Sequence, residues 1–273
     1  MMVLVLGMGV SGAWGQTITT LTQTVCPGSE PYLVNPENPA NTLLWSISTG
    51  TQGVHWTITS PNTASTNVIW ENLTALPVIY TLTFTEDNGT CQTIRSVDVT
   101  VNPRPVAPTA TATLQPTCAV ATGTITVTAP TGTGMTYSID GSTYTNTTGI
   151  FTLVAAGNYT VTARNSDGCT STGTSVTINA QPLTPAAPTA SATLQPTCAV
   201  ATGTITVTAP TGTGMTYSID GSTYTNTTGI FTLVAVGNYT VTARNSDGCT
   251  STGTSVTINA QPASPSTSPI FHN

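Results

Sequence analysis

The chain has 273 residues and a net charge of −6, and only 5% of its residues are charged, against roughly 25% in an average soluble domain. Its four cations are scattered arginines, Arg95, Arg104, Arg164 and Arg244, and it contains no lysine. This composition excludes Schiff-base lysine chemistry and offers no basic patch for a nucleic-acid backbone.

The first fifteen residues have the pattern of a secretion signal. An apolar run over residues 1–10 precedes Ala13-Trp14-Gly15, which matches a small-x-small cleavage site, so residues 1–15 are predicted to be removed. The run is too short to span a bilayer, and we expect no transmembrane span. Residues 7–12 also fit the G-x-G-x-x-G pattern of dinucleotide sites, but that pattern must open a helix. The alternating, β-branched residues 16–22 favour the signal instead.

Residues 16–103 are predicted to form a β-sandwich module. Cys26, Trp45 and Cys91 follow the Cys…Trp…Cys order of immunoglobulin domains. Cys91 departs from that order in one respect, because it opens the last predicted strand instead of lying inside the penultimate one. We therefore expect a bridge from the region of the first strand to the last strand.

Residues 105–184 and 185–264 form a tandem duplication. They align without gaps and differ at only five positions. Proline-rich joints, which act as semi-rigid spacers, punctuate the chain at residues 103–108, 182–188 and 262–269. The predicted modules are therefore 16–103, 104–184 and 185–264, followed by a Pro/Ser tail at 265–273.

Within a repeat, small or apolar residues alternate with threonine at a period of two, as in half-buried strands. Seven strands are predicted in the first repeat, at residues 109–114, 123–129, 135–139, 143–146, 150–154, 158–164 and 169–178. Asp140-Gly141 suits a type I′ hairpin turn, and Tyr159 stands where a tyrosine corner is expected. The predicted fold class is all-β, with tandem immunoglobulin-like β-sandwich domains joined by Pro-rich linkers.

The six cysteines fall two to a module, which indicates disulfides and an oxidising compartment. Six cysteines allow 15 pairings. Pairing inside each module is the simplest of these, and it predicts the bridges Cys26–Cys91, Cys118–Cys169 and Cys198–Cys249. No CxxC motif is present, and His55 and His272 are too far apart to suggest a zinc site.

The repeats resemble the SprB-type repeat of large surface adhesins in gliding and other Bacteroidota. The residues that carry this resemblance are Cys118, Gly123-Thr124-Ile125, Tyr137-Ser138-Ile139-Asp140-Gly141, Phe151, Leu153, Gly157, Tyr159-Thr160-Val161 and Asp167-Gly168-Cys169-Thr170. The leading module is similar to a PKD-like immunoglobulin-type module, through Cys26-Pro27-Gly28-Ser29, Trp45, Val68-Ile69-Trp70 and Gly89-Thr90-Cys91.

The resemblance implies an exported, modular protein used in adhesion or as a stalk. Members of such families usually end in a sorting domain, and residues 262–273 do not resemble one. The chain is therefore expected to be an N-terminal fragment or to be exported by another route.

Few residues suggest chemistry. His55 has no visible Ser or Asp partner and is expected to be structural. No cofactor is expected. The alternative is calcium, which prefers clustered carboxylates, and Glu86-Asp87-Asn88 is its best candidate site. In the repeats we expect the aspartates beside turn glycines to form turns instead of a calcium site: Asp140, Asp167, Asp220 and Asp247.

Two surface features have a functional and a structural interpretation. The alternating Thr122, Thr124, Thr126 and Thr128 could form a flat ice-binding face, but threonine also fills the solvent face of ordinary strands. Trp56 and Trp70 could stack on a sugar, although a core position is the expectation. No residue set supports an enzyme.

Three functions follow from the sequence. The first is a secreted, cell-surface structural or adhesive array whose partners are extracellular surfaces or polysaccharide, and not nucleic acid. The second is a filament subunit that binds other copies of itself by strand addition through residues 16–25. The third is an accessory, carbohydrate-binding part of a secreted enzyme.

Overall fold

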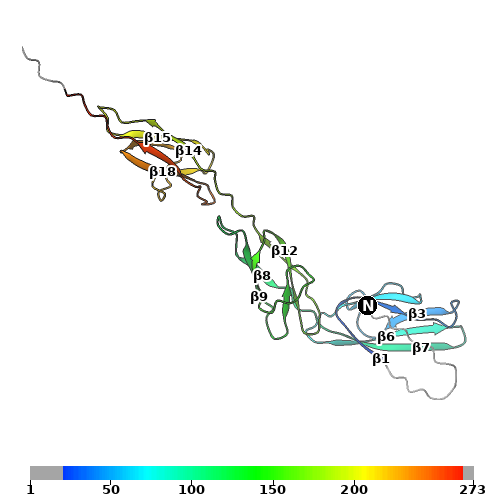
Figure 1. The fold of residues 1–273 in the computed structure, drawn as a ribbon. Coiled ribbons are helices and arrows are strands. Elements are labelled where there is room, and N and C mark those ends of the chain that lie inside the picture. Colours follow the sequence, from blue (N-terminus) through cyan, green and yellow to red (C-terminus); the bar gives the residue numbers. More distant parts are fainter. Residues whose placement is uncertain (1–20, 267–273) are drawn as a thin grey trace, which may run out of the picture. The chain divides into compact units, whose positions relative to one another are not determined.

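The structure is a computed structural model that describes residues 21–266. The predicted signal at 1–15 and most of the Pro/Ser tail lie outside these residues. Between residues 21 and 266 the regular secondary structure consists of strands, without a helix, which confirms the all-β class (Figure 1). No helix of this part of the chain is long and apolar enough to cross a membrane.

Residues 21–103, the leading region, fold into two sheets. The first has the strand order β1-β7-β6-β3, with bounds Leu21–Val25, Gln92–Val101, Val78–Asp87 and Thr42–Ile47. The second has the order β2-β5-β4, with bounds Gly28–Leu33, Ser65–Trp70 and Trp56–Ile58. Neighbouring strands are antiparallel except β1, which pairs with β7 in parallel, so that Val25 lies opposite Val101.

The core of the leading region is built around aromatic side chains from both sheets. Trp70 is fully buried, stacks on Tyr80 at 5.5 Å between ring centroids, and donates its Nε1–H to the Tyr32 hydroxyl at 3.1 Å. Burial of Tyr32 raises the pKa of its hydroxyl to about 12, although the Trp70 hydrogen bond opposes the shift. Trp45 is also buried and donates to the Thr63 carbonyl oxygen at 2.8 Å.

Each repeat forms two three-stranded sheets from six strands. In the first repeat the sheets are β11-β9-β8, with bounds Ile150–Val154, Gly123–Ala129 and Thr109–Leu114, and β10-β12-β13, with bounds Thr136–Ser138, Gly157–Arg164 and Thr174–Ile178. In the second repeat they are β14-β15-β17, with bounds Thr189–Leu194, Gly203–Ala209 and Ile230–Val234, and β16-β18-β19, with bounds Thr216–Ser218, Gly237–Arg244 and Thr254–Ile258.

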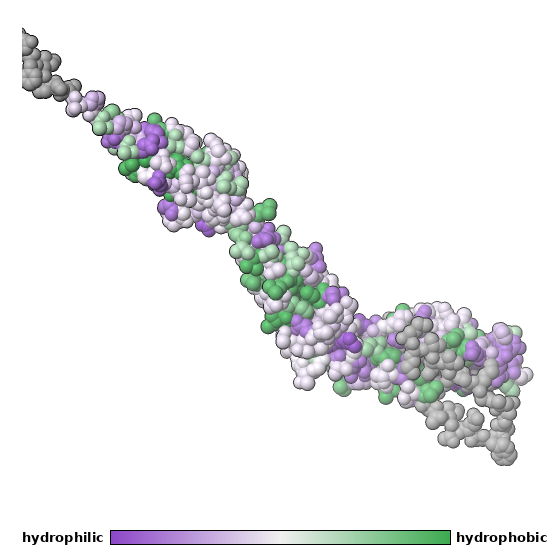
Figure 2. All heavy atoms as spheres, in the orientation of Figure 1, coloured by the Kyte–Doolittle hydropathy of each residue, from purple (hydrophilic) through white to green (hydrophobic). Residues whose placement is uncertain are grey.

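Period-two alternation in the repeats matches their burial. Ile125 and Val127 of β9 are buried, whereas Thr124 and Thr126 are only partly buried. The Thr126 hydroxyl forms a 2.8 Å hydrogen bond with another threonine hydroxyl on β8. Residues of intermediate hydropathy cover much of the face shown in Figure 2, as expected for strands whose outer positions are threonine.

The predicted type I′ hairpin at Asp140-Gly141 is wrong. Tyr137 is bridged to Asn146, so the connection is a wider loop, and the strand predicted at 143–146 is reduced to that single bridge. The loop forms because Asp140 Oδ1 accepts hydrogen bonds from the Ser138 hydroxyl at 2.7 Å and from two backbone amides that follow. These bonds hold the pKa of Asp140 well below its usual range.

The described part of the chain divides into two compact units, one with residues 21–113, 124–154 and 158–177, the other with 114–123, 155–157 and 178–266. The loop 114–123 of the first repeat thus belongs with the second unit. The module boundaries predicted at the proline-rich joints stay predictions.

Replacing Trp70→Ala should lower the free energy of unfolding of the leading region by about 3–5 kcal/mol, because it removes a fully buried ring and leaves the Tyr32 hydroxyl without its donor. Urea unfolding followed by the fluorescence of Trp45 and Trp56 measures this. Ile79→Ala, at a residue 63% exposed, is the control and should change stability by no more than about 0.5 kcal/mol. Equal effects of the two substitutions would contradict the assigned core.

Candidate functional site

One cysteine of each module lies where the chain leaves that module. Cys26 follows β1, whose last residue Val25 pairs with Val101 and accepts a hydrogen bond from the amide of Asn102 at 2.9 Å. Cys26 therefore lies beside the end of β7, the last strand of the leading region.

The repeats place their first cysteine in the same way. The carbonyl oxygen of Cys118 accepts a hydrogen bond from Gln181 Nε2 at 3.1 Å, and that of Cys198 accepts one from Gln261 Nε2 at 3.0 Å. Each glutamine comes three residues after the end of the last strand of its repeat. We call Cys26, Cys118 and Cys198 the exit cysteines.

The other three cysteines lie in hairpins. In the second repeat, Asn245 Oδ1 accepts the amide N–H of Cys249 at 2.9 Å, and the Asn245 amide donates to the Cys249 carbonyl oxygen at 3.1 Å. Asn165 and Cys169 make the same pair of bonds in the first repeat. We call Cys91, Cys169 and Cys249 the hairpin cysteines.

The leading region has a shorter version of this hairpin. Asn88 Oδ1 accepts the Cys91 amide at 2.9 Å, and the Asn88 amide donates to the Cys91 carbonyl oxygen at 3.3 Å. All three hairpins contain a glycine at positive φ, 87° at Gly89 against 85° and 82° in the repeats. Glycine adopts this conformation without steric cost.

The structure forms two disulfides, Cys26–Cys169 and Cys118–Cys249, with Cα–Cα distances of 5.2 and 5.4 Å. The three predicted in-module bridges, Cys26–Cys91, Cys118–Cys169 and Cys198–Cys249, are therefore wrong. Each observed bond joins the exit cysteine of one predicted module to the hairpin cysteine of the next. Cys91 and Cys198 are free and exposed.

In the leading region, strand length explains why Cys26 and Cys91 do not pair. Cys91 precedes Gln92, the first residue of β7, whereas Cys26 lies beside Val101, its last residue. Ten residues of β-strand span about 30 Å. A disulfide needs Cα atoms about 4.4–6.8 Å apart, so the two cysteines of the leading region cannot meet.

The asparagines of the two repeat hairpins, Asn165 and Asn245, also bind the proline-rich joints. Asn165 Nδ2 donates to the Pro103 carbonyl oxygen at 3.1 Å, and Asn245 Nδ2 donates to the Leu183 carbonyl oxygen at 2.8 Å. Each asparagine thus fixes its hairpin cysteine through one side-chain atom and the preceding joint through the other.

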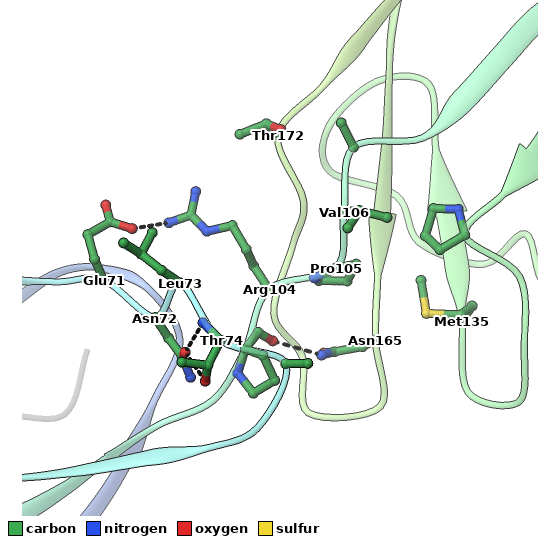
Figure 3. Close-up of a pocket in the computed structure, with 14 residues that line it drawn as sticks. Glu71, Asn72, Leu73, Thr74, Arg104, Pro105, Val106, Met135, Asn165 and Thr172 are labelled. Atoms are coloured by element: carbon green, nitrogen blue, oxygen red, sulfur yellow. Dashed lines mark hydrogen bonds and ion pairs between the residues drawn. The ribbon is translucent and has the colours of Figure 1, made fainter. Parts of the chain in front are cut away.

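A pocket of about 720 Å³ lies beside the first joint (Figure 3). The guanidinium of Arg104 reaches Glu71 at 3.5 Å across it, and both side chains are partly exposed. Leu73 and Val106, about 70% exposed, supply apolar surface. Glu71 and Arg104 are the ionisable side chains among the residues that line this pocket.

Other predicted site residues have structural roles. His55 Nδ1 accepts the Thr51 amide at 3.0 Å in the turn before β4. Trp56 and Trp70 are buried in the core, 9% and 0% exposed, so the sugar-stacking interpretation is wrong. Thr128 donates its hydroxyl to the Thr109 carbonyl oxygen at 3.2 Å, which uses that group within the sheet.

The carboxylates predicted as candidate calcium ligands accept hydrogen bonds from the protein. Glu86 accepts bonds from the Asn41 side chain and from the amides of Glu37 and Asn38, at 2.7 to 3.2 Å. Burial raises the pKa of Glu86, but these bonds and the charge of Arg95 lower it below its usual value. Asp87 accepts the Gly89 amide and the Gln92 side chain.

In the repeats, Asp167 and Asp247 lie in the hairpin turns, and Asp220 repeats the loop bonds of Asp140. Over residues 21–266 no group of three or more His, Cys, Asp or Glu side chains is placed to hold a metal ion.

Neither a protein-family model nor a curated protein matches the chain in sequence. A PKD domain from the KIAA 1837 protein is 22% identical, covers 35% of this chain and 93% of its own, and has a TM-score of 0.24. Titin domains A168–A170 are 13% identical and cover 88% of this chain and 96% of their own, with a TM-score of 0.31.

The fibronectin(III)-like modules of Clostridium thermocellum CbhA are 14% identical and cover 60% of this chain and 92% of their own, with a TM-score of 0.30. Similarities this low leave the function to be argued from the residues of the chain.

Glu86→Gln should destabilise the leading region by about 1–3 kcal/mol near neutral pH, because the buried carboxylate loses its charge and one of the two oxygens that accept three N–H groups. The folded pKa lies below the unfolded value of about 4.3. The ionised carboxylate therefore stabilises the fold above that value, and this stability is lost as the pH falls through the folded pKa.

Urea midpoints measured at about pH 7 and about pH 3 should thus fall less on acidification for Glu86→Gln than for the wild type. Glu37→Gln, at an exposed side chain of the same loop, is the matched control and should keep the wild-type pH dependence. If the urea midpoint of Glu86→Gln falls between pH 7 and pH 3 as much as that of the wild type, the hydrogen bonds to the Glu86 carboxylate do not stabilise the fold.

Proposed function

We propose that the protein is a secreted, extracellular structural or adhesive array, in which disulfides join each β-sandwich module to the next. The observation that carries this proposal is the pair of bonds Cys26–Cys169 and Cys118–Cys249. Disulfides persist in oxidising compartments, which agrees with the predicted secretion signal at residues 1–15. A joint that has a second covalent connection beside it restricts the motion of its modules more than a peptide linker alone.

The resemblance of the repeats to SprB-type repeats of Bacteroidota surface adhesins supports the same role. Near-identical repeats that each hold the preceding joint provide a simple way to lengthen a stalk, because every added copy brings its own exit cysteine, hairpin cysteine and joint-binding asparagine. The partner of such an array would be an extracellular surface or a polysaccharide.

The filament alternative, in which residues 16–25 pair as a strand with another copy, needs a correction. Residues 21–25 of the expected donor segment already form β1 and are paired with β7 along its whole length. Residues 16–20 lie outside the described part of the chain. Strand addition through 16–25 would therefore require β1 to leave its sheet.

Thiol mapping tests the disulfide array. The unreduced monomer should expose two free thiols, at Cys91 and Cys198, and non-reducing peptide mass spectrometry should recover Cys26 linked to Cys169 and Cys118 linked to Cys249. Recovery of the in-module pairs instead would remove the basis of the proposal. Full reduction, which frees all six thiols, calibrates the count.

Antibody labelling of intact producing cells tests the location and role. Antibodies against residues 21–266 should decorate the cell surface, and deletion of the gene should reduce attachment to surfaces. Complementation with the double variant Cys26→Ser, Cys118→Ser should restore attachment less well than the wild type. Its modules should still fold, but only the peptide linkers would connect them. Labelling confined to the cell interior would contradict the extracellular role.

A further inference from the structure

The two disulfides follow one pairing rule, and this rule leaves two cysteines without a disulfide partner. The exit cysteine of a module bonds to the hairpin cysteine of the next module. Applied to three modules, this rule leaves the first hairpin cysteine, Cys91, and the last exit cysteine, Cys198. These are the two free, exposed cysteines of the described chain.

Cys198 has a bonded counterpart of the same sequence and local structure. The residues around Cys118 and Cys198 are identical from 112 to 130 and from 192 to 210. In both loops the amide of the preceding threonine donates to a valine carbonyl oxygen, at 2.9 and 2.8 Å, and a glutamine holds the cysteine carbonyl. Since Cys118 in this loop forms a disulfide with a hairpin cysteine, Cys198 has the setting to do the same.

Cys91 has the setting of the matching partner. Its amide and carbonyl are held by Asn88 as those of Cys169 are held by Asn165, and both hairpins contain a glycine at positive φ. The Cys91 hairpin closes β6 and β7 at the end of the sheet opposite Val101, where the chain leaves the leading region. Cys91 thus lies at the entry end of the first module, and Cys198 lies at the exit end of the last.

We propose that Cys198 of one copy forms a disulfide with Cys91 of a second copy, so that the chain assembles head to tail into covalent polymers. This inference rests on the proposed oxidised array. Because two different surfaces meet, the contact is heterologous and leaves the same two ends available on every linear product. Growth therefore continues unless the two ends of one product meet and close a ring.

The chemistry needs an oxidant of the disulfide class, such as oxidised glutathione. The Cys198 thiolate attacks one sulfur of the oxidant, forms a mixed disulfide and releases one thiol. The Cys91 thiolate of the second copy then attacks Cys198 Sγ and releases the second thiol. Two protein thiols are oxidised and one oxidant disulfide is reduced, and the two protons leave with the released thiols.

The test mixes two variants of the full chain in a glutathione redox buffer. Cys91→Ser keeps only the exit thiol, and Cys198→Ser keeps only the hairpin thiol, and both residues are exposed, so neither substitution disturbs a core. The wild type should form a ladder on non-reducing gels that collapses on reduction. The equimolar mixture should stop at dimers.

Mass spectrometry of the mixed dimers decides the result. Random oxidation makes half of the dimers heterodimers, whereas complementary ends should favour the Cys198–Cys91 heterodimer by roughly tenfold over both homodimers, because docking raises the effective concentration of the two thiols. Absence of dimers, a random mixture, or native protein with Cys198 bonded to a further repeat would overturn the inference. Mapping Cys26–Cys169 in the same samples separates the outcomes, because only loss of this internal bond would also remove the proposed function.

Discussion

The separation between the two ends of a strand is the constraint on which the organisation of this protein depends. The exit cysteine lies at one end of the last long strand of the leading region and the hairpin cysteine at the other, about 30 Å away. A disulfide tolerates no such gap. Oxidation can therefore join Cys26 of the leading region only to a cysteine outside that region, and a bond that usually stabilises the interior of a small sandwich instead connects separate sheets.

Hydrogen bonds take the place of charge throughout the repeats. With few charged residues, the chain fixes its loops by side-chain oxygens that accept backbone N–H groups, as Asp140, Asn146 and Asn165 do. Asn245 shows how much one such residue can do, since it closes the hairpin, positions Cys249 and holds the joint before the repeat. The neutral asparagine acceptors among these are insensitive to salt, in contrast to surface ion pairs.

Much of the fold could be predicted from the sequence, because alternation of threonine with apolar residues marks strands directly. The strands at 109–114, 123–129 and 150–154 were predicted with the bounds that the structure has. The wider loop at Asp140 could not be predicted in this way, because it is held together by a hydrogen bond between the Ser138 hydroxyl and the Asp140 carboxylate. The disulfide pairing depends on the parallel direction of β1, which places Cys26 at the far end of β7, and no local pattern encodes that direction. The buried positions of Trp56 and Trp70 likewise depend on which faces of two sheets meet.

The two disulfides interlock, because Cys118 lies inside the loop closed by Cys26 and Cys169, and Cys169 lies inside the loop closed by Cys118 and Cys249. Three backbone paths therefore run in parallel between the two bonds, from 26 to 118, from 118 to 169 and from 169 to 249. Under tension, the shortest path of 51 residues limits the distance between Cys26 and Cys249 to about 180 Å, against about 780 Å for the reduced chain. A protease that cuts one path leaves the other two intact. The chain thus resists both stretching and cleavage through its covalent connectivity, independently of how stable each sandwich is.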